Sequence, residues 1–177
     1  MRPDLSSSVL QLSYHMNAPT KRHYGPAKRT LRFSRSTTNL STVYQRGSFN
    51  VRGYADAAYI SHTAPSKSME RFIFFLGNAA LSWSAHRQSV VTCSSTEGEV
   101  VGPIEATSEA KFSTFPIELR RNPCPASIME DNKGAADLAE HGAFFKRSKR
   151  IIVVRVPYMN EQVNLGEMKV IRVSTHD

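Results

Sequence analysis

The sequence predicts an α/β protein in which a mixed β-sheet is flanked by helices and preceded by a short N-terminal helical segment. Apolar residues near the N-terminus recur at helical spacing, whereas short runs rich in β-branched and aromatic residues follow from residue 49 onward. The later runs alternate with helical stretches, which is typical of a sheet with helices packed on it. At 177 residues the chain can form one domain with a hydrophobic core plus an appendage. We therefore predict a basic helical segment at residues 1–48 and a sheet domain at residues 49–177.

The N-terminal segment is predicted to contain two helices. Apolar residues recur at helical spacing between Leu5 and Met16, with Asp4 placed to cap the helix start. A second, basic helix is expected to open at Thr20, and Pro26 falls inside it. Because an interior proline removes a backbone hydrogen bond and clashes with the preceding turn, we expect this helix to restart at Pro26.

Several short runs in the sheet domain have the composition of strands. Gly77-Asn78 separates two of them and is a good hairpin signal. A Ser/Thr cluster before residue 97 is predicted to open a helix, and a second helical stretch is predicted after residue 132. The predicted strands lie at residues 51–56, 72–76, 80–83, 89–93, 126–131 and 168–173.

The composition excludes several classes of protein. No apolar run approaches the ~18 residues of a membrane span, and the N-terminus does not have the pattern of a secretory signal. Cys93 and Cys124 form no disulfide framework, and none of the six histidines has a zinc-like spacing. We therefore expect an intracellular protein, cytoplasmic or nuclear, that is not secreted and has no membrane partner.

The formal net charge of +8 is concentrated near the N-terminus. Residues 1–50 contain eight Lys or Arg and one acidic residue, whereas residues 51–177 contain 15 basic and 14 acidic residues. A localised basic surface favours a polyanion such as nucleic acid, and a solvated helix face or loop is the equal alternative. The candidate nucleic-acid-binding residues are Lys21, Arg22, Lys28, Arg29, Arg32, Lys146, Arg147, Lys149 and Arg150.

Three acidic residues form the candidate catalytic site. Asp56 lies in the first predicted strand, Glu99 on the helix opened by the Ser/Thr cluster, and Asp131 at the end of a later apolar run. Such carboxylates could converge on two divalent cations ~3.5–4 Å apart, which clamp the attacking and leaving oxygens of a phosphodiester. Mg²⁺ suits oxygen ligands of this kind, with Mn²⁺ as the alternative. Taken singly, each acid is more typical of a turn, a cap or an exposed helix carboxylate.

Six short motifs occur in order along the chain. They are GYADA (Gly53–Ala57), FFLGNAALSWSAHRQ (Phe74–Gln88), SSTEGE (Ser94–Glu99), EDNKGAADLA (Glu130–Ala139), FKRSKRI (Phe145–Ile151) and EQVNLGEMK (Glu161–Lys169). Together these motifs resemble the ribonuclease H domain of copia-type retrotransposon polyproteins, from Gly53 to Asp177. Residues 1–33 resemble the end of the reverse transcriptase region that precedes this domain.

The resemblance implies a fold, a reaction and partners. It implies a ribonuclease H-like, mixed five-stranded sheet flanked by helices. Asp56, Glu99 and Asp131 match the family's metal-binding catalytic acids, which implies two-metal hydrolysis of the RNA strand of RNA–DNA hybrids. The implied partners are an RNA–DNA hybrid or other nucleic acid, and the remainder of a Pol polyprotein with its reverse transcriptase.

Some positions depart from the family pattern. Ala58 stands where a second acid is usual, and the chain stops before the position of a fourth metal-binding acid. Gly102-Pro103 interrupts the helix that carries Glu99, so that the proline clash falls on the Glu99 carbonyl, and Pro116 breaks the helix again. Three alternatives stay open: an impaired ribonuclease H, a catalytically inactive remnant with non-specific nucleic-acid binding, and, with less support, an integrase-like transferase.

Overall fold

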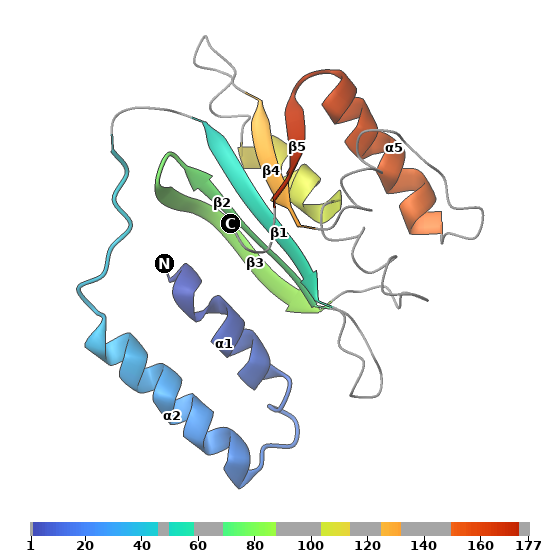
Figure 1. Ribbon diagram of the computed structural model, residues 1–177. Helices are drawn as coiled ribbons and strands as arrows, with labels where there is room; N and C mark the ends of the chain where they lie inside the picture. Colours follow the sequence, from blue (N-terminus) through green and yellow to red (C-terminus); the bar gives the residue numbers. More distant parts are fainter. Residues whose placement is uncertain are drawn as a thin grey trace. The chain divides into compact units, whose positions relative to one another are not determined.

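A computed structural model of the protein is shown in Figure 1 and describes residues 2–45, 50–58, 69–87, 104–113, 125–131 and 150–173. The chain divides into two compact units, Met1–Val43 and Tyr44–Asp177. Across these described ranges, no helix combines the length and the apolar character that crossing a bilayer requires.

The first unit contains two helices, α1 (Pro3–Ser13) and α2 (Lys21–Ser36). Arg2 ties the start of α1 to the end of α2, because its guanidinium donates to the backbone oxygen of Thr37 at 2.9 Å and to Asp4 at 2.7 Å. The hydrogen bond from Arg2 lowers the pKa of Asp4. The prediction that Asp4 caps α1 is wrong, because the helix begins one residue earlier at a proline, a residue favoured in the first helical turn.

The helix α2 runs through Pro26 without a break, so the prediction of a restart there is also wrong. The ring of a proline normally disfavours helical backbone at the preceding residue by clashing with its Cβ. That residue is Gly25, which has no Cβ and open space around it. The predicted start is confirmed, since Thr20 is the N-cap residue and its N–H donates to His23 Nδ1 at 3.0 Å.

The second unit is built on a mixed five-stranded sheet with the order β3-β2-β1-β4-β5 (Figure 1). β1 pairs antiparallel with β2, and β2 with β3, whereas β1–β4 and β4–β5 are parallel. The predicted hairpin is confirmed, with Gly77 in its turn at φ 62°. The strand predicted at residues 89–93 lies outside the described residues. The strands are β1 (Val51–Ala58), β2 (Met69–Leu76), β3 (Ala79–Arg87), β4 (Ala126–Glu130) and β5 (Met168–Arg172).

One face of the sheet forms the core with helical residues 104–113 (yellow in Figure 1). Side chains alternate along each strand, so inward positions lie two residues apart. The small residues Ala106 and Ala110 let the helix approach the sheet closely. The core cluster consists of Val51, Ala55, Phe74, Ala106, Ala110, Ala126, Ile128 and Met168.

The helix α5 (Arg150–Asn164) was not predicted. Its first half is rich in β-branched residues, which favour strands, and it contains Pro157. Tertiary packing overrides this preference, because Val156, Met159 and Gln162, which recur every three residues, are buried on one side of the helix. Gly166 ends the segment in the left-handed region at φ 73°, which glycine adopts without steric cost.

Gly53 is a position at which the fold requires glycine. It pairs with Phe74 across β1 and β2, and an added Cβ would lie 2.6 Å from Cδ1 and 2.8 Å from Cζ of that ring. Phe74 is fully buried in the core of the sheet, so its ring cannot move aside into solvent. We expect Gly53→Ala to lower the free energy of unfolding by about 1–3 kcal/mol, the usual cost of overpacking, as measured by urea denaturation.

A double variant controls this measurement. The double variant Gly53→Ala/Phe74→Leu should be more stable than the sum of the two single losses predicts, because the clash is relieved. If the stability loss of the double variant equals the sum of the losses of the two single variants, the packing explanation is wrong.

Candidate functional site

Asp56 and Asp131 come from neighbouring parallel strands. Asp56 lies near the end of β1, and Asp131 directly follows β4. The register pairs Tyr54 with Met129, and each aspartate lies two residues beyond this pair on its own side of the β1–β4 ladder. Both aspartates are exposed. The parallel pairing thus carries two of the three predicted acids at the same end of neighbouring strands, although they are 75 residues apart in the sequence.

Arg71 adds a positive charge beside this acid pair. It is the cross-strand partner of Asp56 on β2, and its Nη1 lies 3.8 Å from Asp56 Oδ2. The Asp56 side chain is 59% exposed and that of Arg71 35%, so water screens their attraction and the ion pair is weak. Arg71 therefore leaves Asp56 available for a cation and also offers a donor to an approaching phosphate.

The remaining predicted acid, Glu99, lies outside the described residues, as do the helix-breaking positions Gly102, Pro103 and Pro116. The convergence of three acids therefore stays a prediction. Residues 146–149, predicted as a basic turn that contacts nucleic acid, also lie outside the described residues. Arg150 begins α5, but the structure describes only its backbone, so its predicted role likewise stays a prediction.

The N-terminal basic residues form a stripe along α2. At about 100° per residue, the six Lys and Arg side chains of this helix fall within an arc of about 140°. All six are exposed, and Lys28 Nζ lies 4.4 Å from the centre of the Tyr24 ring, a cation–π contact. This stripe presents a row of positive charges that suits a phosphate backbone. Its members are Lys21, Arg22, Lys28, Arg29, Arg32 and Arg35.

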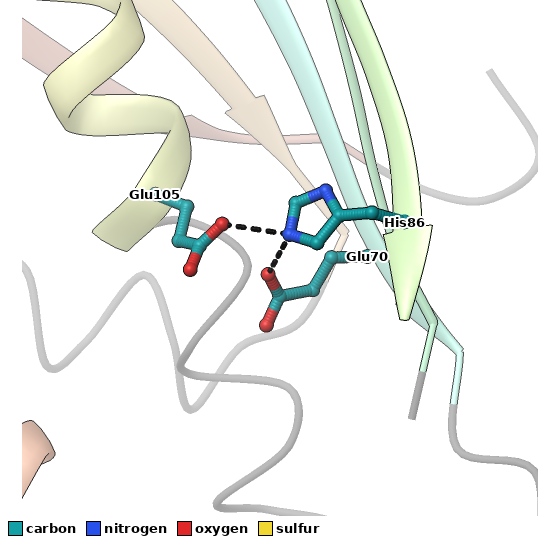
Figure 2. A group of neighbouring side chains, drawn as sticks. All are labelled: Glu70, His86 and Glu105. Carbon is teal, nitrogen blue, oxygen red and sulfur yellow. Dashed lines mark ion pairs between the residues drawn. The ribbon is translucent and has the colours of Figure 1, made fainter. Parts of the chain in front are cut away.

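Sequence reasoning missed a compact group formed by Glu70, His86 and Glu105 (Figure 2). His86 Nε2 lies 2.9 Å from Glu105 Oε2 and 3.2 Å from Glu70 Oε2. The first two residues are cross-strand partners on β2 and β3, and the third lies in helical residues 104–113. Their spacing in the sequence matches no motif. One feature of the sequence could have indicated the group. Glu70 lies two and four residues before Phe72 and Phe74, so strand alternation places this charged side chain on the same buried face as the two phenylalanines.

The group borders an open cavity of about 880 Å³. His86 and Glu105 lie at its wall together with Ser84, Glu109 and Tyr158. Glu70 is 2% exposed, whereas the side chains of His86 and Glu105 are 39% and 26% exposed. The group therefore has a buried end at Glu70 and an accessible end at the cavity.

The chain is similar in sequence to known polyproteins. It is 33% identical over 182 aligned residues to the Retrovirus-related Pol polyproteins from transposons RE2 and RE1 of Arabidopsis thaliana. Each alignment covers 99% of this chain and 12% of the relative, so the chain spans about an eighth of these polyproteins. It is also 34% identical over 114 residues to the Secreted RxLR effector protein 161 of Plasmopara viticola. That alignment covers 64% of this chain and 80% of the effector protein. No family model matches the chain.

Solved structures agree on the fold. The structure superposes on LC11-RNase H1, isolated from compost, with a TM-score of 0.54 at 9% identity over 72% of this chain and 86% of that one. LC11-RNase H1 in complex with an RNA/DNA hybrid matches with a TM-score of 0.52, also at 9% identity, over 72% of this chain and 87% of that one. At such low identity these matches show the fold alone. The chain is therefore homologous over its whole length to a segment of copia-type Pol polyproteins, and it has a ribonuclease H-like fold preceded by two helices.

Proposed function

We propose that this chain is the ribonuclease H-type domain of a copia-type Pol polyprotein and hydrolyses the RNA strand of RNA–DNA hybrids. The observation that carries the proposal is the parallel pairing of β1 with β4, since Asp56 and Asp131 each lie two residues beyond the Tyr54–Met129 pair and both are exposed. A solved relative in fold, LC11-RNase H1, binds an RNA/DNA hybrid, which supports the same class of substrate here.

The proposed site holds Mg²⁺, with Mn²⁺ as the alternative, through Asp56, Asp131 and Glu99. Exposed carboxylates fit such ions, because Mg²⁺ prefers oxygen ligands and keeps several waters. When bound, a pair of these ions supplies the positive charge that activates water and stabilises the leaving oxygen. In this proposal the chain positions the two aspartates, because β1 and β4 are paired just before them and a rigid sheet reduces the reorganisation needed to bind an ion.

The substrate is proposed to be recognised by shape and charge. A-like hybrid duplexes are read through their backbone and 2′-hydroxyls rather than through base edges. Arg71 beside Asp56 supplies a donor for a phosphate near the acids. The basic stripe of α2, which belongs to the other compact unit, supplies binding without sequence selectivity.

A second candidate function is non-catalytic nucleic-acid binding by an inactive member of the family. The observation that favours it is Gly102-Pro103, since a helical proline clashes with the carbonyl four residues earlier, and that residue is Glu99. Ala58, in place of a second acid in β1, points the same way. In this case the basic stripe of α2 is the functional surface.

Cleavage of a labelled RNA–DNA hybrid tests the first candidate. We expect Mg²⁺-dependent cleavage that falls roughly 100-fold or more in Asp56→Asn and in Asp131→Asn, as on removal of a preorganised group that stabilises charge. Glu161→Gln, which removes an exposed acid on α5, should keep the wild-type rate. Cleavage that survives in both aspartate variants would reject this pair as the site, and a wild-type chain that binds but does not cleave would support the second candidate.

The salt dependence of hybrid binding tests the basic stripe. Each phosphate contact that is lost should reduce the slope of log K against log salt by about 1. We therefore expect Arg29→Gln/Arg32→Gln to lower the slope by about 2 when binding is followed by fluorescence anisotropy. Lys169→Gln, an exposed lysine on β5, serves as the control. An unchanged slope in the double variant would show that α2 presents only a solvated face.

A further inference from the structure

The donor atoms of Glu70, His86 and Glu105 have the spacing of ligands around one metal ion. All three lie within 4.8 Å of one another, and His86 Nε2 is 2.9 Å and 3.2 Å from the two carboxylate oxygens. Two ligands that each lie about 2.0–2.2 Å from one ion are roughly 3.0–3.5 Å apart. The imidazole and both carboxylates can therefore reach a shared ion with only small side-chain adjustments.

The backbone holds the three residues in place through three different elements. Glu70 and His86 are paired across the antiparallel β2–β3 hairpin. Glu105 lies in helical residues 104–113, between the buried residues Ile104 and Ala106. Figure 2 shows the carboxylate of Glu105 and that of Glu70 directed at the same ring nitrogen. This geometry depends on core packing rather than on a mobile loop.

The second ring nitrogen of His86 also has a partner. Nδ1 lies 3.1 Å from Ser84 Oγ. When Nδ1–H donates to this hydroxyl, the lone pair of Nε2 points toward the carboxylates. A hydrogen bond from the distal ring nitrogen is typical of metal-binding histidines, because it fixes both the tautomer and the ring orientation.

The charge balance favours a divalent cation. Two ionised carboxylates with a neutral imidazole carry two negative charges, and protonation of His86 leaves one. A divalent ion with a neutral His86 makes the group neutral. Glu70 is 2% exposed, and net charge at a buried position is costly.

We propose that Glu70, His86 and Glu105 form a binding site for a divalent transition metal, with Zn²⁺ as the best-matched ion. An imidazole with two carboxylates suits Zn²⁺, whereas Mg²⁺ and Ca²⁺ prefer oxygen ligands alone. Three protein ligands leave a fourth position for water or a small ligand, and the cavity of about 880 Å³ that His86 and Glu105 line offers a route to it.

This site is separate from the acid pair. Glu70 shares the packed face of the sheet with Phe72 and Phe74, whereas Asp56 is opposite Arg71 on the other face. The proposal therefore stands whether or not the chain cleaves hybrids. Bound metal would join the β2–β3 hairpin to helical residues 104–113 and so stabilise the second unit.

Zinc binding by the intact, metal-free chain tests the proposal. We expect one Zn²⁺ per chain by calorimetry, no displacement by excess Mg²⁺, and a melting temperature raised by roughly 5–10 °C at 100-fold excess over Kd. Co²⁺ should give visible absorption bands from the same site. His86→Gln and Glu105→Gln should each lose this binding.

Three variants serve as matched controls that should retain zinc. Glu109→Gln removes an acid at the wall of the same cavity, where it accepts a hydrogen bond from Ser82. His23→Gln removes a ring of the stacked His15–His23 pair, an alternative imidazole site. Asp131→Asn removes part of the acid pair and so separates this proposal from the nuclease proposal.

Two results would overturn the proposal: no zinc uptake at micromolar concentrations, or unchanged uptake by His86→Gln and Glu105→Gln. Circular dichroism checks that both variants fold. If either variant fails to fold, X-ray absorption spectroscopy of the zinc-loaded wild-type chain identifies the atoms around the zinc ion and so tests the proposed ligands directly. A shell of one imidazole and oxygen ligands supports the site, whereas two imidazoles or none rejects it.

Discussion

The pairing of β1 with both of its neighbours is the constraint on which the rest of the sheet unit depends. β1 is the middle strand of five, antiparallel to β2 and parallel to β4. Its inward residues alternate with its outward ones, so a slip of one residue would exchange the core residue Ala55 with Asp56. The close contact between Gly53 and Phe74 helps to fix this register. Asp56 and Asp131 both follow the β1–β4 ladder two residues after its last pair, Tyr54 with Met129.

The two faces of the sheet therefore offer different chemistry. The acid pair lies on the exposed side, where water has access and where ions that keep their hydration shell are favoured. The group of Glu70, His86 and Glu105 lies on the packed side, where burial makes net charge costly and a nitrogen donor is present. The two faces of one sheet thus carry different kinds of candidate metal ligand: carboxylate oxygens alone on the exposed face, and carboxylate oxygens with an imidazole nitrogen on the packed face.

Homology to copia-type Pol polyproteins extends over both units, although the chain spans only about an eighth of the matched polyproteins. The division of charge between the units is consistent with a division of roles. The basic stripe belongs to the helical unit, whereas the sheet domain is close to neutral and carries the acids. Attraction to a nucleic acid and the chemistry proposed for it would therefore reside on different parts of the chain.

Local patterns were sufficient to predict the class of fold, the β2–β3 hairpin at Gly77-Asn78 and the start of α2 at Thr20, because turn and capping residues act over a few positions. The same reasoning failed at Pro26, where the preceding Gly25 has no Cβ for the proline ring to contact, and at α5, where burial of Val156 and Met159 overrode a strand-like composition. Sequence alone also named Asp56 and Asp131, but only the structure showed that they lie at the same end of two neighbouring parallel strands. The group around His86 came from the tertiary structure alone, because its ligands meet through sheet pairing and helix packing, which no sequence spacing records.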